Sequence, residues 1–266
     1  MTFVSSATTH VGMVRKVNQD SYAERTDIGV WAVADGMGGH EAGEIASATI
    51  TDFIKNLPPH DNIQEMLAAV EQSIMAANLQ LTEQAASYDS QRVPGSTVVV
   101  LIINGNQGAI VWVGDSRIYR RRDQVVTQLT RDHSHVQDLV EQGVILESEA
   151  ESHPMANVIT RAVGISEPLE LDSMWIDVRP DDQFLLCSDG LSRLVTIEEL
   201  ESMMANMDSE EVTQSLLHTA LVRGARDNVT LICVKNLADA GEAAGDDEAT
   251  VIQNAASLDE LDFDFD

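Results

Sequence analysis

The sequence predicts an α+β protein built as a four-layer αββα sandwich, with two antiparallel β-sheets in the middle and helices on both outer faces. Short runs rich in Val and Ile follow one another with Gly, Asn or Asp between them, which is typical of strands joined by hairpins. Amphipathic helical segments come in pairs, set apart from these runs, instead of alternating with single strands. The apolar share of 44% is ample for a packed core.

Seven segments are predicted to be strands because they are apolar and bounded by turn residues. They cover residues 28–34, 96–103, 109–113, 118–121, 124–129, 183–188 and 229–235. Residues 104–108, Asn-Gly-Asn-Gln-Gly, have the composition of a hairpin loop. Residues 114–117 and Asp123 lie in two further tight connections. Successive hairpins of this kind indicate antiparallel sheets.

Four segments are predicted to be helices because apolar residues recur in them at helical spacing. They cover residues 40–55, 63–87, 197–204 and 209–223. Asn62, Thr196 and Asp208 each precede a helix and have Glu three positions later, which is the pattern of an N-terminal capping box. Gly224 is suited to end the last helix.

The chain is strongly acidic, with 44 Asp and Glu against 16 Lys and Arg and a formal net charge of -28. This charge argues against binding nucleic acid through its phosphates and against binding an anionic membrane. The first residues lack the features of a signal peptide, and no apolar run approaches the ~18 residues of a membrane span. Cys187 and Cys233 lie inside apolar runs, so we expect buried thiols in a cytoplasmic protein.

The composition changes near residue 236, which divides the chain into two parts. Residues 237–266 contain ten acidic residues and no basic ones, and Ala and Gly dominate their first part. Such a segment cannot bury enough apolar surface to order itself. We therefore expect one folded domain over residues 1–236 and a flexible acidic tail over residues 237–266.

Five aspartates border apolar runs: Asp20, Asp35, Asp115, Asp189 and Asp227. A strand end delivers a side chain to the rim of a sheet, where several carboxylates repel each other unless a cation neutralises them. Hard oxygen ligands suit Mg²⁺ or Mn²⁺, and the carbonyl of Gly36 could add a further ligand. Each Asp-Gly or Asp-Asn pair alone is more typical of an ordinary turn than of a metal site; their number favours a metal site.

Two basic residues could serve chemistry at such a site. Arg15 precedes Asp20 in a polar stretch, and a guanidinium binds phosphate through two hydrogen bonds. Metal ions and an arginine together satisfy the needs of phosphoryl transfer, which are charge neutralisation and positioning. His40 could donate a proton to a leaving alkoxide. Taken singly, Arg15 could equally be a surface arginine, and His40 a residue that merely packs at a helix start.

Eight short motifs follow one another along residues 5–236. They are Arg15-x-x-Asn18-Gln19-Asp20, Asp35-Gly36-Met37-Gly38-Gly39-His40, Pro94-Gly95-Ser96-Thr97, Gly114-Asp115-Ser116-Arg117, Leu129-Thr130-x-Asp132-His133-Ser134, Arg161-Ala162-Val163-Gly164, Ser188-Asp189-Gly190 and Asp227-Asn228. In this order they resemble the motifs of the metal-dependent PPM, or type 2C, serine/threonine protein phosphatases in their bacterial form. The resemblance implies the same sandwich fold and a binuclear Mn²⁺ or Mg²⁺ centre, with two ions per subunit.

The resemblance also implies a role for each metal-site residue. Asp35 would bridge the ions, the Gly36 carbonyl would bind one of them, and Asp189 and Asp227 would bind the other. Asp20 would support the site, partly through water.

Further positions match the surroundings of the metal centre. Asp115 corresponds to a residue that helps to hold a third, weaker ion, and Arg15 to the phosphate-binding arginine. His40 corresponds to a histidine that could act as proton donor. Residues 132–158 correspond to a variable flap beside the site, which is expected to influence substrate choice.

These correspondences imply a phosphatase that hydrolyses phosphoserine and phosphothreonine in proteins by direct attack of a metal-activated water. Its partners would be phosphorylated protein substrates and a cognate Ser/Thr kinase that it opposes, and it would act as a monomer. Two alternatives stay open: another two-metal phosphoester hydrolase, and a non-catalytic adaptor that binds phosphoproteins. The order of the motifs argues against the first, and the complete set of carboxylates argues against the second.

A separate hypothesis concerns Thr250 in the acidic tail, which follows acidic residues and precedes Ile252 by two positions. This pattern resembles sites that bacterial Ser/Thr kinases phosphorylate and that forkhead-associated domains bind. Phosphorylation would add about 1.5 to 2 negative charges and create a docking point for arginines. An inert, solubilising tail explains the same residues equally well.

Overall fold

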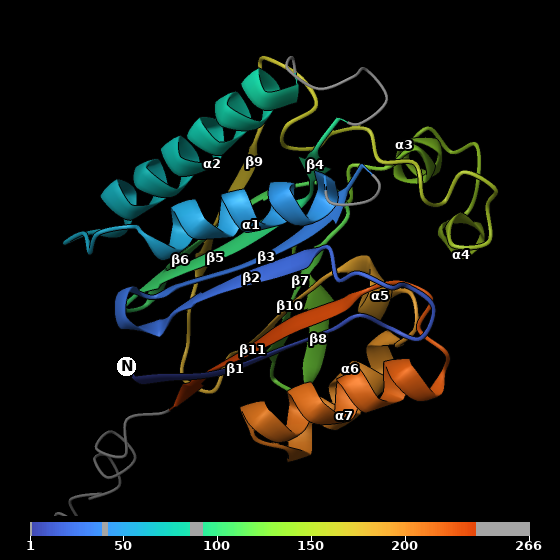
Figure 1. Cartoon of the computed structure of the whole chain (residues 1–266). Coiled ribbons are helices and arrows are strands. Elements are labelled where there is room, and N and C mark those ends of the chain that lie inside the picture. Colours follow the sequence, from blue (N-terminus) through green and yellow to red (C-terminus); the bar gives the residue numbers. More distant parts are fainter. Residues whose placement is uncertain (1, 39–41, 86–92, 238–266) are drawn as a thin grey trace, which may run out of the picture.

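The computed structural model describes residues 2–38, 42–85 and 93–237, which form two stacked β-sheets with helices on both outer faces (Figure 1). The predicted α+β sandwich is therefore confirmed. One sheet has the order β1-β11-β10-β7-β8 and the other the order β2-β3-β5-β6-β9, with β4 paired to β3. All paired strands are antiparallel.

The strand bounds follow the sheet order. The first sheet contains β1 (Thr2–His10), β11 (Val229–Leu237), β10 (Gln183–Cys187), β7 (Arg117–Arg122) and β8 (Val125–Gln128). The second contains β2 (Asp20–Arg25), β3 (Val30–Met37), β5 (Val98–Asn104), β6 (Gln107–Val113), β9 (Asp172–Asp177) and β4 (Gly95–Ser96).

Two helix pairs form the outer layers, as predicted. Helices α1 (Ala42–Lys55) and α2 (Ile63–Ala85) cover the second sheet, while α6 (Ile197–Asn206) and α7 (Ser209–Val222) cover the first (Figure 1). Short helices α3 (His135–Glu141) and α4 (Glu147–Ala150) lie in the predicted flap, and α5 (Asp189–Ser192) follows β10 directly. Thr196 and Asp208 form the predicted capping boxes, and the Asn62 side chain accepts a hydrogen bond from the amide of Glu65.

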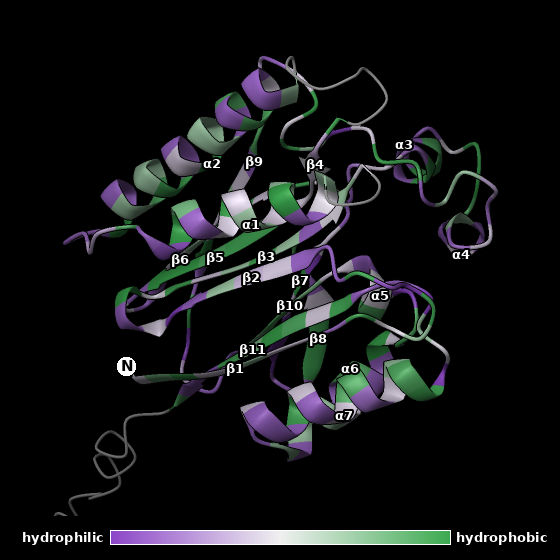
Figure 2. Cartoon of the chain, viewed as in Figure 1, coloured by the Kyte–Doolittle hydropathy of each residue, from purple (hydrophilic) through white to green (hydrophobic). Residues whose placement is uncertain are grey.

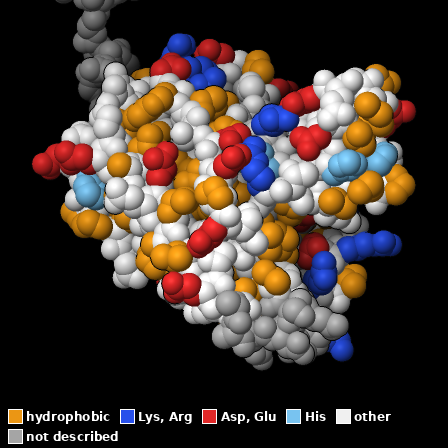
Figure 3. Space-filling model, turned by 90° about the horizontal axis from the view of Figure 1, so that it is seen from above, with side chains coloured by type: hydrophobic (Ala, Val, Ile, Leu, Met, Phe, Trp, Pro, Cys, Tyr) orange, Lys and Arg blue, Asp and Glu red, His pale blue; other side chains and the backbone are white. Residues whose placement is uncertain are grey.

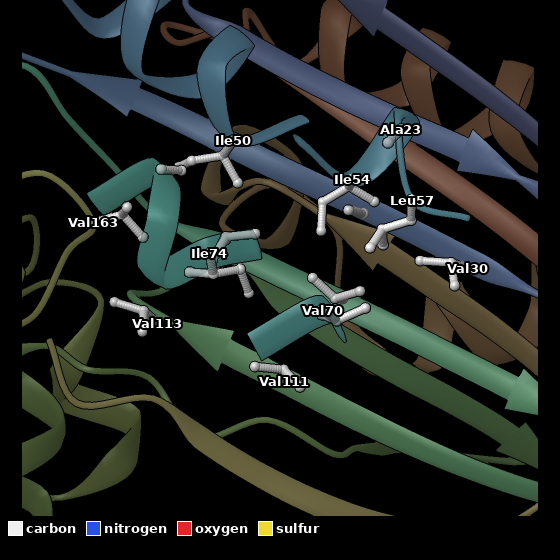
Figure 4. Close-up of a cluster of buried hydrophobic side chains, with 14 of the residues drawn as sticks. Ala23, Val30, Ile50, Ile54, Leu57, Val70, Ile74, Val111, Val113 and Val163 are labelled. Carbon is white, nitrogen blue, oxygen red and sulfur yellow. The ribbon is translucent and has the colours of Figure 1, made fainter. Parts of the chain in front are cut away.

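Three buried clusters hold the layers together. The cluster between the sheets contains Trp31, Leu101 and Phe184, and a second lies under α6 and α7. Figure 4 shows the third, in which Ile50 and Ile54 of α1 and Val70 and Ile74 of α2 belong to the same cluster as Val111 and Val113 of β6. The inner strands β3, β5, β6, β10 and β11 are mostly hydrophobic, whereas the helices carry both hydrophobic and hydrophilic residues (Figure 2). This is the pattern of strands buried on both faces and helices buried on one.

Three strands were not predicted, and all three lie at sheet edges: β1, β2 and β9. Their residues alternate between exposed and partly buried, or are polar, so they lack a continuous apolar run. An edge strand needs only one buried face, and the periodicity that marks it is weak.

The boundary of the predicted tail lies close to the end of β11. This strand ends at Leu237, the first residue assigned to the tail, and residues 238–266 lie outside the described residues. Among the described residues, none of the helices combines the length and hydropathy that a membrane-spanning segment requires.

Candidate metal centre

The predicted carboxylates come from both sheets and meet at one end of the sandwich. Asp20 and Asp35 are opposite each other in the register of β2 and β3. Asp189 starts α5 directly after β10, and Asp227 precedes β11, the neighbour of β10. The Ser188 hydroxyl donates to Asp20 Oδ2 at 2.8 Å, which joins the two sheets at this point. Asp35 lies close enough to Asp189 that the Asp189 carboxylate raises the pKa of Asp35.

Two glycines allow the backbone to pack closely around these carboxylates. A Cβ on Gly36 would lie 2.0 Å from the carbonyl oxygen of Gly43, at the start of α1. A Cβ on Gly190 would lie 1.9 Å from the carbonyl oxygen of Asn228. Both separations are far below van der Waals contact, so only glycine fits at either position.

The loop that carries Arg15 is attached to the same rim through Asn228. The side-chain Nδ2 of Asn228 donates to the carbonyl oxygens of Val11 and Val17, each at 3.0 Å. Its Oδ1 accepts from the amide of Gln19 at 2.8 Å. This loop, α5 and the flap lie at the same end of the sandwich in Figure 1.

Arg15 itself reaches the carboxylate cluster from the surface. Its Nη2 lies 2.6 Å from Asp227 Oδ2, and its side chain is 53% exposed. Asp35 and Asp189 also raise the pKa of the Arg15 guanidinium, after the hydrogen bond to Asp227. A half-exposed, firmly cationic side chain at the rim of an acidic site suits an anionic ligand.

Burial makes the carboxylate cluster costly to ionise. It raises the pKa of Asp20 and that of Asp115 to about 7, and neighbouring carboxylates add to both effects. Burial, then Asp20 and Asp189, raise the pKa of Asp35 well above its usual range, and burial also raises the pKa of Asp189. A cation in their midst would reverse these shifts, because it favours the charged form.

Two buried carboxylate oxygens indicate whether these residues could bind a metal ion. Asp20 Oδ1 and Asp115 Oδ1 are buried, and neither finds a hydrogen-bond partner among the described residues. An unsatisfied buried carboxylate oxygen is costly, and coordination to a hard divalent ion would satisfy it. The donor set, carboxylates with a nearby backbone carbonyl, therefore fits Mg²⁺ or Mn²⁺.

Side-chain rotation would still be needed to complete such a site. Among the described residues, no three His, Cys, Asp or Glu side chains are already placed as ligands around one point. Arginines hold some of the oxygens instead: Arg15 binds Asp227, while Arg193 Nη2 lies 3.2 Å from Asp115 Oδ2 and 2.9 Å from Asp189 Oδ2. The carboxylates that these arginines hold would turn to an ion when one binds.

Sequence reasoning found the aspartates and Arg15 but missed some residues that organise them. The Ser188 hydroxyl donates to Asp20, and Arg193 connects Asp115 with Asp189. The spacing of Asp189 and Arg193, four positions apart in a short helix, was the available signal for that contact. His40 lies outside the described residues, so its predicted place remains a prediction.

Comparison with known proteins decides the family. The family model described as Protein phosphatase 2C matches residues 12–251. This chain belongs to the protein phosphatase 2C family. It is 35% identical to the serine/threonine protein phosphatase PstP of Mycobacterium tuberculosis over 92% of its own length, and it spans about half (49%) of PstP. It is 32% identical to the serine/threonine phosphatase stp of Listeria innocua, with 88% of this chain and 96% of that protein covered.

Solved structures of the protein phosphatase 2C family agree with this fold. The structure of PppA, described as a key regulatory component of T6SS in Pseudomonas aeruginosa, is 40% identical, with a TM-score of 0.81 over 88% of this chain and 97% of that one. The catalytic domain of PstP in complex with two manganese ions is 32% identical, with a TM-score of 0.79. The match covers 89% of this chain and 99% of that one. The predicted family and fold are confirmed, and the predicted two-ion Mn²⁺ or Mg²⁺ cofactor and phosphatase class agree with these relatives.

Proposed function

We propose that this chain hydrolyses phosphoserine and phosphothreonine in proteins at a centre of two Mn²⁺ or Mg²⁺ ions. One observation carries the proposal. Carboxylates from both sheets converge at one end of a protein phosphatase 2C fold, and two of their buried oxygens have no hydrogen-bond partner within the part of the chain that the structure describes. The two manganese ions in the PstP structure support the same assignment.

We assign the ion ligands to the carboxylates at the strand ends. Asp35 would bridge the ions, the Gly36 carbonyl would bind one of them, and Asp189 and Asp227 would bind the other. Asp20 would support the site, and its orientation is already restricted because the Ser188 hydroxyl donates to it. Divalent ions held there would neutralise phosphoryl charge and lower the pKa of an attacking water.

Arg15 would bind the phosphoryl oxygens. In the protein alone its guanidinium binds Asp227, and it would be released for the substrate when Asp227 binds an ion. Its fork of N–H groups can then grip two phosphoryl oxygens and orient the phosphorus for in-line attack. We propose His40 as donor of a proton to the leaving serine or threonine oxygen, on the resemblance alone.

The partners, the cellular location and the oligomeric state of the protein stay predictions. Opposition to a Ser/Thr kinase, binding of a forkhead-associated domain, cytoplasmic location and a monomeric state all rest on the sequence. Thr250, on which the forkhead-associated hypothesis depends, lies outside the described residues.

The proposal is tested by phosphate release from a phosphothreonine peptide. We expect release with Mn²⁺, none with EDTA, and a loss of more than about 100-fold with Asp35→Asn, since even changes behind a metal ligand cost 10- to 100-fold. Asp52→Asn is the matched control, because Asp52 lies on α1 at the surface, and its side chain pairs with Lys55. Release that survives EDTA or the Asp35 substitution would overturn the proposal.

A further inference from the structure

The loop that carries Arg15 exposes three large apolar side chains beside the carboxylate cluster. Met13 is 62% exposed, Val14 is 65% exposed and Val17 is 44% exposed. Single exposed apolar residues are common on protein surfaces, whereas several in one short loop form a patch that suits an apolar ligand group. This patch surrounds the arginine that we assign to the phosphoryl group.

The backbone of the loop is held firmly, so the apolar side chains have a fixed place next to the site. The amide of Met13 donates to the carbonyl oxygen of Ala225 at 2.8 Å. A Cβ on Gly12 would lie 2.1 Å from the carbonyl oxygen of Asp227, so the loop packs directly against that residue. Met13 and Arg15 thus both lie along the segment that carries a proposed metal ligand.

The charge of this region differs from that of the rest of the chain. Residues 1–19 contain no Asp or Glu, although the whole chain has 44 of them. Arg15 and Lys16 are the two Lys or Arg residues of this stretch. A phosphorylated segment of another protein can therefore approach the loop without the repulsion that an acidic surface would cause.

We infer that Met13 and Val14 bind an apolar side chain of the substrate, one or two positions from the phosphorylated residue. An extended peptide advances about 3.3 Å per residue, so such a side chain reaches the neighbours of Arg15 when Arg15 holds the phosphoryl group. The protein would then prefer phosphopeptides that are apolar around the phosphorylated residue. The inference rests on the proposed function and adds which phosphoproteins the site takes.

Two phosphothreonine peptides of equal length and charge test this preference. One has Val at the two positions on either side of the phosphothreonine, and the other has Ser there. We expect the wild type with Mn²⁺ to show a kcat/KM higher by at least about fivefold for the Val peptide, less than the 10- to 200-fold of a methylene in an enclosed pocket. The gain should lie mostly in KM, because the contact is the same in the ground state and the transition state.

Variants then show whether the patch produces the preference. The double variant Met13→Ser, Val14→Ser should bring the ratio of the two kcat/KM values close to one, and Met13→Leu should keep it. The control is Met75→Ser with Val125→Ser, because Met75 on α2 and Val125 on β8 are 40% and 57% exposed and belong to other elements. The control should keep the preference of the wild type.

Hydrolysis of p-nitrophenyl phosphate separates this inference from the proposed function, since that substrate has no neighbouring residues. A wild type that hydrolyses it and both peptides with Mn²⁺, but without preference, overturns the inference alone. So does a preference that survives in the double variant, including the case in which that variant changes only the association of copies of this chain. A protein that hydrolyses none of the three substrates overturns the proposed function.

Discussion

At the scale of single residues, the candidate site depends on hydrogen bonds that hold carboxylates in place before any ion binds. Ser188 is fully buried, accepts a hydrogen bond from the Thr230 amide at 3.0 Å and donates its own proton to Asp20. This chain of bonds gives the Asp20 carboxylate one orientation. Groups that orient a ligand in this way contribute much of the affinity of a metal site.

Removal of the Ser188 hydroxyl should therefore weaken metal binding without unfolding the protein. We expect Ser188→Ala to lower Mn²⁺ affinity by about 10- to 100-fold, measured by calorimetry, while circular dichroism stays unchanged. Ser202→Ala is the control, because Ser202 is exposed on α6 far along the chain from this contact. Equal affinities in the two variants would contradict the orienting role.

At the scale of elements, the base of the flap is fastened to the second sheet through His133. Its ring is buried and stacks on Trp112, its Nδ1 accepts from the amide of Gly114 at 3.1 Å, and its Nε2 lies 3.2 Å from Asp172 Oδ2. The amide of Thr160 donates to the carbonyl oxygen of His133. The neutral ring, with its proton on Nε2, satisfies both side-chain contacts.

Acid should loosen the base of the flap, because a second proton on His133 removes the acceptor of the Gly114 amide. Burial and Arg161 lower the pKa of His133, with Arg131 adding to them, and Asp172 opposes them. A lowered pKa means that this stabilisation is complete above the usual pKa of about 6.5 and is lost as the pH falls below it.

The measurement is hydrogen exchange around the flap base between pH 7 and pH 5, corrected for intrinsic rates. We expect protection of the amides of Gly114 and Thr160 to fall relative to amides in β5. Protection that falls equally in both regions would indicate a global effect and contradict a role for His133.

At the scale of the whole molecule, acidic side chains lie both on the surface and in the candidate metal centre. The chain carries a net charge of -28. On the face seen in Figure 3, the described acidic, basic and hydrophobic side chains are interspersed. The carboxylates at the candidate centre differ from these surface groups because Asp20 and Asp115 are buried, Asp35, Asp189 and Asp227 are partly buried, and both sheets bring them together.

The effect of a metal ion on the free energy of unfolding should therefore depend on pH. The pKa of Asp20 and that of Asp115 are raised to about 7 in the folded protein, so the folded state keeps protons that the unfolded state releases near pH 4. Without metal, the free energy of unfolding should fall as the pH rises from about 4 to about 7. An ion replaces those protons, so its stabilising effect should grow over the same range.

Thermal unfolding with EDTA and with Mn²⁺ at several pH values measures this effect. We expect the difference in Tm between the two conditions to be larger at pH 8 than at pH 5. The Asp20→Asn variant should reduce that growth, because it removes one of the titrating groups. A difference in Tm that does not depend on pH would contradict protonation of the buried carboxylates.

The elements that the sequence predicted correctly are those with a strong local signal. Strands β3, β5, β6, β10 and β11 are nearly continuous apolar runs, and the capping residues Thr196 and Asp208 mark helix starts by their own side chains. The edge strands β1, β2 and β9 were missed because pairing with a neighbour, rather than their own composition, makes them strands.

The residues of the candidate site also fall into two groups, those with a local signal in the sequence and those without one. The five aspartates and Arg15 could be identified from the sequence alone, because acidic residues beside apolar runs and glycines are recognisable without a structure. The contacts of Ser188 with Asp20, and of Arg193 with Asp115 and Asn157, could be found only in the folded chain. These partners lie 168, 78 and 36 residues apart, and contacts at such separations arise from the stacking of the sheets rather than from any local pattern.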